Sequence, residues 1–278
     1  FGHSLRGMKG WFFLGWFYFQ PVELIKLIFI IVLAKIWAEK VKEANELKRI
    51  ILSFLFLLPL VILTFFQPDF GSSLIFIFIW FFITSLNIQK IKYIIFILIF
   101  FILISLFFWQ FILKDYQKAR IITFFSPQKD PFGQGYQISQ AKIAVGAGGL
   151  FGRGIGKGSQ GQMRFLPASR TDFIFATLAE ELGFFGSVLL IGLFVLIFLK
   201  IIRISRLVYD NFSFFLILGI GFNLFLHVVI NIGMNLGLLP IVGLPLPLLS
   251  YGGSHLITTL ISLGIVESIV IHQKIPFT

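Results

Sequence analysis

Seven long apolar segments restrict the fold of this chain more than any other feature. A bilayer core requires about 20 consecutive apolar residues for each helix that crosses it. The mean hydropathy is +0.96, and a soluble core of 278 residues has no room for so much apolar surface. We therefore predict an all-α, polytopic integral membrane protein. Its seven transmembrane helices are expected over residues 18–38, 50–66, 71–86, 93–113, 173–202 (interrupted at Gly183 and Gly186), 212–239 and 251–271.

Basic residues in short loops predict how these helices are oriented. Lys and Arg gather in residues 39–49, 87–92 and 200–206, and cytoplasmic loops carry such an excess. Alternation through seven spans then places residues 114–172 outside the cytoplasmic membrane. We expect a single membrane domain, 1–278, with residues 114–172 as a large extracytoplasmic loop. The chain has no Cys, which excludes disulfides and thiolate metal sites.

This predicted loop is strongly basic. It holds three aspartates, and a loop of this length is only weakly governed by the positive-inside rule, so the positive excess calls for another explanation. We predict that the loop binds an anion, with lipid pyrophosphates as the main candidates. Besides Lys114 at its first position, the basic residues of this loop are Lys118, Arg120, Lys129, Lys142, Arg153, Lys157, Arg164 and Arg170.

The loop contains a glycine-rich tract from Gly146 to Gly161. Its GxGxxG string follows no predicted strand, so a dinucleotide site is excluded. A Walker A loop is excluded too, because Gly158 rather than Ser or Thr follows Lys157. Two interpretations stay open: backbone N–H groups that wrap a phosphate, or a loop packed closely on the membrane domain.

Asp172 lies where the loop enters the fifth predicted helix. An N-cap and a catalytic carboxylate are both compatible with this position, and Arg164 and Arg170 are near in sequence. Glu180 and Glu181 follow about two turns later. Carboxylates at this depth are costly unless they face water, a cation or a partner, so we predict that these two glutamates line a functional cavity.

Other polar residues lie within the predicted helices. Glu23 and Lys26 are three residues apart and are expected to form an ion pair, because pairing lowers the cost of both charges. Asp69 is a candidate helix cap. A polar stripe recurs every fourth residue on the sixth helix, and interhelical hydrogen bonding is its expected role. Its members are Asn223, His227, Asn231 and Asn235. No partner for a metal accompanies His227 at ligand spacing on that helix.

The motifs together resemble those of the SEDS family of bacterial cell-wall polymerases, over nearly the whole chain. The matching elements are Trp11 followed by QPxE and Lys26, QPDxGSS at residues 67–73, GYQ with Gln137 and Gln140, GGLxGxGxGxG, FLPxxxTDFIFAxxAEExGFxG, and NIGMxxGLLPxxGxPLPxxSYGGS. The chain departs from the family pattern at Gly10, Val22 and residues 168–170. Because this family normally has ten spans, the seven here would be the fourth to tenth, with three helices absent from this sequence.

The resemblance implies an enzyme that polymerises lipid II into glycan strands with inversion and releases undecaprenyl pyrophosphate. It assigns the catalytic carboxylate to Asp172 and a membrane-embedded pair to Glu23 and Lys26. The implied partner is a class B penicillin-binding protein, and the implied location is the bacterial cytoplasmic membrane. No nucleic acid is expected as a partner. A divalent cation, Mg²⁺ or Mn²⁺, is a candidate cofactor. The alternatives are a lipid II flippase and a noncatalytic scaffold. The residues expected to contact lipid II or its pyrophosphate are Arg153, Lys157, Arg164, Arg170, Gln137 and Gln140.

Overall fold

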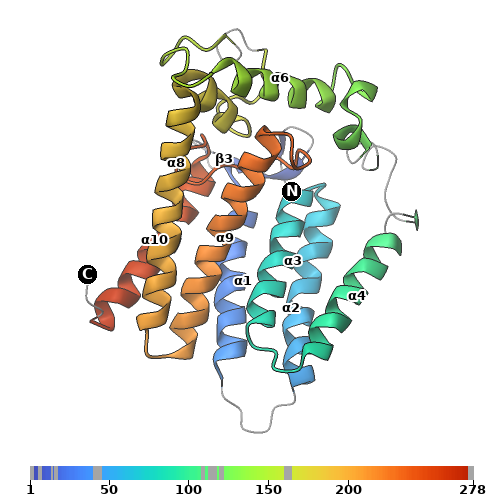
Figure 1. The fold of residues 1–278 in the computed structure, drawn as a ribbon. Coiled ribbons are helices and arrows are strands. Elements are labelled where there is room, and N and C mark those ends of the chain that lie inside the picture. The colour runs from blue at the N-terminus through green and yellow to red at the C-terminus, as the bar shows by residue number, and fades with distance from the viewer. Residues whose placement is uncertain are drawn as a thin grey trace. The chain divides into compact units, whose positions relative to one another are not determined.

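The protein is mostly helical (Figure 1). The computed structural model describes residues 3–5, 8–13, 15, 18–39, 46–107, 110–111, 118, 122–159 and 165–274. Among these, a long helix lies over each of the seven apolar segments, although the fourth predicted segment continues past Phe107 into residues that are mostly outside the described ranges. The long helices are α1 (Pro21–Ala38), α2 (Glu46–Phe66), α3 (Phe70–Ser85), α4 (Ile91–Phe107), α8 (Ile174–Leu207), α9 (Asn211–Asn235) and α10 (Gly253–His272).

Four of these helices, α2, α8, α9 and α10, are long and apolar enough to cross a membrane. The helices α3 and α4 are apolar but shorter, and α1 has 18 residues that include Glu23, Lys26 and Lys35. The chain is therefore a multi-pass membrane protein. Seven crossings and an extracytoplasmic loop at 114–172 stay predictions.

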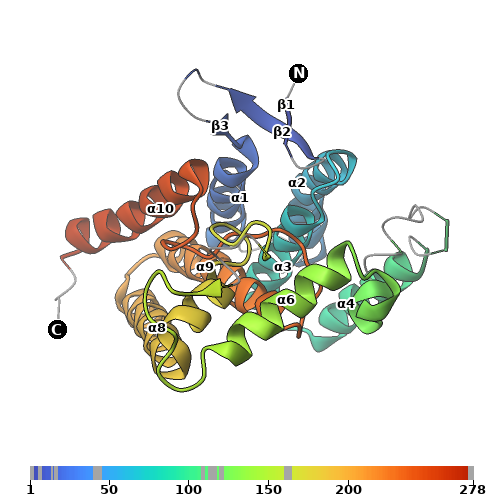
Figure 2. The same ribbon diagram turned by 90° about the horizontal axis from the view of Figure 1, so that it is seen from above.

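A small antiparallel sheet precedes α1 and departs from the all-α prediction. Its strands β1 (His3–Leu5), β2 (Met8–Phe13) and β3 (Tyr18–Phe19) lie in the order β1-β2-β3 (Figure 2). Gly15, in the connection between β2 and β3, has φ +84°, a conformation that suits glycine in a reversing chain. Aromatic residues such as Phe12, Phe13 and Tyr18 favour strands. The strands were not predicted because they are much shorter than the apolar segments from which the helices were predicted.

The chain forms two compact units. Unit 1 comprises residues 1–87, 191–229 and 244–278, and unit 2 comprises residues 88–190 and 230–243. In unit 1, α1 packs against α2, α3 and α10. A Cβ on Gly219 of α9 would lie 2.5 Å from Ile30 and 3.1 Å from Ile83, so this glycine allows α9 to approach α1 and α3 closely, as small residues do between membrane helices.

Local sequence explains where several helices begin. Pro21 is the first residue of α1, a position that requires no N–H donor. Asp69 caps α3 as predicted: its Oδ1 accepts a hydrogen bond from the Ser72 N–H at 3.0 Å and its Oδ2 accepts one from the Ser72 hydroxyl at 2.7 Å. Asp210 accepts from the Ser213 N–H at 2.8 Å before the first turn of α9. Partial burial alone would raise the pKa of Asp210, but hydrogen bonds from Ser213 and Gln273 hold that pKa below its ordinary value.

The predicted interruption of α8 is confirmed at Gly183 and is wrong at Gly186. Gly183 has φ 68° and ψ −161°, which no helix contains. Gly186 lies within the helical part that follows. A Cβ on Gly186 would lie 2.2 Å from Leu182 Cβ, so the glycine at 186 serves close packing beside the break rather than a second break.

Candidate functional site

Asp172 is held in place through its backbone. It is partly exposed and lies two residues before the start of α8. Its carbonyl oxygen accepts hydrogen bonds from the Nδ2 atoms of Asn231 and Asn235, both at 3.0 Å. Asn235 Oδ1 in turn accepts from the Ala176 N–H at 3.0 Å. The last turns of α9 therefore fix the start of α8, and the side chain of Asp172 starts from a fixed backbone position.

These contacts refine the prediction for the polar stripe. Asn231 and Asn235 are both fully buried and form interhelical hydrogen bonds, as predicted. Their partners, however, are backbone groups at the start of α8. Buried amides that satisfy otherwise unpaired backbone groups at a helix terminus stabilise that terminus. The sequence indicated the stripe but not its partner.

A non-helical segment follows α9, as its prolines and glycines predict. The N–H groups of Leu238 and Leu239 both donate to the Gly233 carbonyl, at 2.8 and 3.2 Å, and the helix ends before residue 239. Gly237 has φ +67°, which is a common helix-ending conformation. We call residues 237–243 the GLLP segment. A Cβ on Gly243 would lie 3.8 Å from Asp172 Oδ2, so the carboxylate of Asp172 borders this segment.

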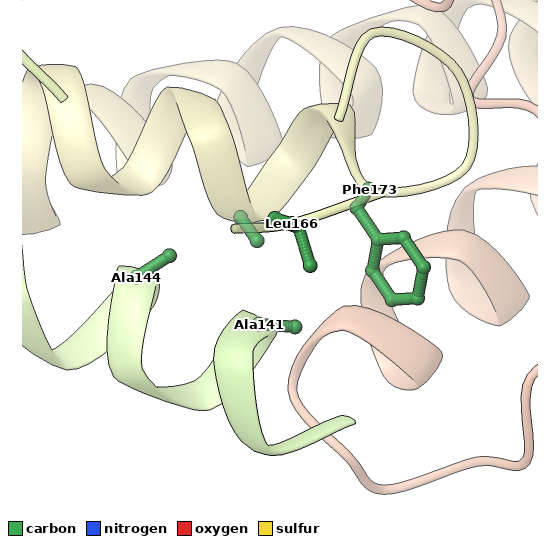
Figure 3. Packing of buried hydrophobic residues seen from close by; sticks show 5 residues of the cluster. Ala141, Ala144, Leu166 and Phe173 are labelled. Carbon is green, nitrogen blue, oxygen red and sulfur yellow. The ribbon is translucent and has the colours of Figure 1, made fainter. Parts of the chain in front are cut away.

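The helix α6 (Gln134–Ala147) lies in the predicted extracytoplasmic loop and shares a buried cluster with the start of α8. Ala141 and Ala144 on α6 face Leu166 and Phe173 in a buried cluster that also contains Ala176 (Figure 3). Small residues on α6 permit this close approach. Because Phe173 follows Asp172 in the chain, the cluster places α6 near the backbone that carries the candidate carboxylate.

The remaining predicted substrate contacts differ in their exposure. Gln137 and Gln140, both on α6, are partly buried. Lys157 and Arg170 are exposed, so their charges are available to a ligand. Arg164 lies outside the described residues.

The broken part of α8 carries backbone groups that lack helical partners. Arg153 N–H donates to the Glu180 carbonyl and Gly154 N–H to the Glu181 carbonyl, each at 3.0 Å. These two N–H groups of the glycine tract are thus used by the protein itself. They do not form a phosphate cradle, and the alternative of close packing is the one observed for this part of the tract.

The tract also accepts hydrogen bonds from the far side of the break. Phe184 N–H donates to the Gly149 carbonyl at 2.9 Å and Phe185 N–H donates to the Leu150 carbonyl at 3.2 Å. Irregular backbone at membrane depth is tolerated where protein satisfies its polar groups. Residues 149–154 supply these partners, so the tract and the break stabilise each other.

A side-chain network reinforces this attachment. Glu180 is fully buried, and its Oε1 accepts a hydrogen bond from the Ser159 hydroxyl at 3.1 Å. Arg153 Nη1 donates to Ser159 Oγ at 2.9 Å and lies 3.7 Å from Glu180 Oε1. A buried carboxylate requires such partners. The structure thus brings together two predicted site residues, Arg153 and Glu180, in an internal ion pair. Glu181 is partly exposed and contributes its carbonyl to the tract.

Unit 1 contains a separate buried cluster around the predicted ion pair. Lys26 Nζ lies 2.7 Å from Glu23 Oε1, and both side chains are almost fully buried. His255 Nδ1 lies 2.8 Å from Glu23 Oε2, and Lys26 Nζ lies 3.4 Å from His227 Nε2. The pairing of Glu23 and Lys26 is confirmed. The two histidines were not predicted to join them, because their companions come from other helices.

Three of these side chains have donor atoms close enough to hold a metal ion. One atom each from Glu23, His227 and His255 lie within 4.8 Å of one another. Two imidazoles suit a transition metal better than Mg²⁺, which prefers oxygen ligands. Lys26 also holds the carboxylate already, so a divalent cation would meet a buried ammonium. The buried ammonium disfavours Mg²⁺ or Mn²⁺ at these three side chains, so they are not the site of the candidate divalent cation, and we derive no step through them.

The fold and the site define a class: a multi-pass membrane protein with a carboxylate fixed at a helix start beside a basic, glycine-rich segment. The family model described as cell cycle protein, FtsW/RodA/SpoVE, matches residues 1–275. The chain belongs to this family, which confirms the resemblance drawn from the motifs.

Individual relatives agree with this assignment. The chain is 38% identical over 278 residues to the peptidoglycan glycosyltransferase MrdB of Escherichia coli strain K12, covering 99% of this chain and 74% of that protein. It is 36% identical to the stage V sporulation protein E of Bacillus subtilis strain 168, covering 96% and 73%. Family membership and the apolar helices together identify a multi-pass inner-membrane protein of bacterial type.

Solved structures show the same fold. A structure describing how a peptidoglycan synthase complex coordinates polymerization and crosslinking contains a chain that is 30% identical, with a TM-score of 0.80, covering 98% of this chain and 75% of that one. The rod shape determining protein RodA of Thermus thermophilus is 29% identical with a TM-score of 0.66, covering 99% and 73%.

Proposed function

We propose that the protein is a peptidoglycan glycosyltransferase that polymerises lipid II on the extracytoplasmic side of the membrane. The relative in Escherichia coli is named for this enzyme class. The observation that carries the proposal for this chain is the fixed position of Asp172, whose carbonyl is held by Asn231 and Asn235 at 3.0 Å. Catalysis requires reacting groups held in a productive geometry.

In the proposed reaction, the 4-hydroxyl oxygen of one sugar attacks the anomeric carbon of another. The bond from that carbon to the diphosphate oxygen breaks, and its electron pair leaves with undecaprenyl pyrophosphate. Asp172 accepts the hydroxyl proton as general base, an assistance of about 10²–10⁴ in rate. The exposed cations Lys157 and Arg170 are candidates to stabilise the departing charge.

The test is Asp172→Asn in the purified protein with lipid II, with product chains resolved on a gel. We expect normal folding, retained lipid binding and loss of polymerisation. Asp210→Asn is the matched control: it makes the same chemical change at the start of α9, where Asn also caps well, and should retain the wild-type rate. A fully active Asp172→Asn variant would refute the assignment of the base.

The gel assay, combined with a measurement of lipid II transfer between the leaflets of vesicles that contain the protein, separates the alternatives. A flippase would move lipid II between leaflets of a vesicle and form no glycan, and a scaffold would do neither. Adding a chelator, then Mg²⁺ or Mn²⁺, tests the proposed dependence on a divalent cation. A class B penicillin-binding protein is the proposed partner, supported by the similarity to a chain in a complex that coordinates polymerization with crosslinking.

A further inference from the structure

Two glycines of the GLLP segment have no role in the function proposed above. Gly237 and Gly243 have φ values of +67° and +69°, a region that L side chains rarely adopt. Both belong to the motif NIGMxxGLLPxxGxPLP. Their conformation alone explains why glycine suits these positions, but their surroundings carry more information.

Gly237 accommodates the end of a lysine. A Cβ on Gly237 would lie 2.1 Å from Lys142 Cε and 2.8 Å from Lys142 Nζ, and 3.3 Å from Ile138 Cγ2. The aliphatic tail of Lys142 therefore crosses the backbone of Gly237, and its ammonium ends at the GLLP segment. Lys142 as a whole is an exposed residue, so a ligand can approach this side chain from solvent.

The carboxylate of Asp172 reaches the same segment. Its Oδ2 would lie 3.8 Å from a Cβ on Gly243. The backbones that carry the two charges also meet, because Ala141 and Phe173, their chain neighbours, pack in one buried cluster (Figure 3). Lys142 and Asp172 therefore both border residues 237–243, and their chain neighbours share one buried cluster of unit 2.

The described basic residues of the loop are not equivalent. Arg153 is committed to Ser159 and to the buried Glu180, and releasing it would leave that carboxylate without a cation. The tail of Lys142 is instead positioned by the backbone of Gly237, so its ammonium can turn to a ligand without leaving a buried carboxylate behind.

We propose that Lys142 is a catalytic residue that contacts the diphosphate of the substrate beside Asp172. This rests on the proposed function and adds one residue to it. When the bond to the anomeric carbon breaks, the electron pair moves to the diphosphate oxygen, and the Lys142 ammonium stabilises the negative charge that develops there. The proton of the attacking hydroxyl goes to Asp172, so the two side chains act on opposite ends of the same displacement.

The test compares Lys142→Met and Lys142→Arg with wild type in lipid II polymerisation by the full chain. We expect Lys142→Met to lower kcat by about 10²–10³-fold, as loss of one preorganised donor does, and Lys142→Arg to restore part of that loss. Lys92→Met, which removes an exposed lysine at the start of α4, should leave the rate unchanged. Thermal unfolding of each variant shows whether it is folded.

A second test displaces the Lys142 side chain without replacing that residue. Gly237→Ala puts a methyl group where the Lys142 tail lies and should lower the rate toward that of Lys142→Met. Gly149→Ala is the control, because Gly149 also has positive φ, +54°, but has nothing within 4 Å of the added methyl. A wild-type rate in both Lys142→Met and Gly237→Ala overturns the inference while the proposed function stands. If wild type forms no glycan, the proposed function itself fails.

Discussion

Gly152→Ala tests whether the glycine tract is held by the break in α8. A Cβ at this position would lie 2.1 Å from the Glu181 carbonyl oxygen and 2.7 Å from the Gly183 nitrogen. Both are backbone atoms, so no side chain can move aside. Gly152 also has φ +78°. The substitution must therefore separate residues 152–154 from the break.

The expected cost follows from the contacts that are lost. Two backbone hydrogen bonds, from Arg153 and Gly154 to the carbonyls of Glu180 and Glu181, contribute about 1 kcal/mol each. A left-handed conformation costs a non-glycine residue about 1–2 kcal/mol. The tract should detach more easily by about 3–4 kcal/mol. This change in free energy raises the fraction of molecules in which the tract is detached from α8 by about two to three orders of magnitude.

Hydrogen exchange of the Arg153 and Gly154 amides in detergent measures this opening directly. Gly149→Ala is the control, since it adds left-handed strain without a clash and should cost only about 1 kcal/mol. Polymerisation should fall in Gly152→Ala, because the basic segment no longer keeps its place. Equal exchange rates in the two variants would show that the tract is not held by these contacts.

Two further predictions concern buried polar groups. Lys26→Met should lower the free energy of unfolding by about 3–5 kcal/mol, because it leaves Glu23 buried without its cation. Thermal unfolding should show that the double variant with Glu23→Gln regains most of this loss. An unchanged melting temperature for the single variant would contradict the argument. Asn235→Leu removes the acceptor of the Ala176 N–H and one donor to the Asp172 carbonyl, so we expect a loss of about 1–3 kcal/mol in stability and slower polymerisation. If the Asn235→Leu variant polymerised lipid II at the wild-type rate, the asparagines would not be what positions Asp172.

The helices could be predicted because each is specified by its own residues. Apolar length and Asp69 as a cap are local signals, and the structure confirms them. The first helix was predicted from residue 18 but begins at Pro21, because residues 18–19 form the strand β3. The break at Gly183 was predicted for the same reason. The prediction of a break at Gly186 was wrong because a glycine that serves close packing has the same sequence signature as one that interrupts a helix.

Contacts between distant residues could not be predicted in this way. His227 has no companion on its own helix, and its neighbours Glu23 and His255 come from α1 and α10. The sequence of the glycine tract is compatible with phosphate binding, and only the structure shows that two of its N–H groups, those of Arg153 and Gly154, pair with α8. Lys142 is one of nine basic residues in the loop at 114–172, and only the position of Gly237 distinguishes it.

The Glu23–Lys26 pair has a consequence for how the chain enters the membrane during synthesis. Its two members are three residues apart on one helix, whereas His255 is separated from Glu23 by 232 positions. Residues at this spacing meet as soon as one turn forms, so Glu23 and Lys26 can pair before the ribosome has made α9 or α10. The nascent helix can therefore leave the translocon with these two charges compensated, and the histidines add their contacts when the last helices arrive.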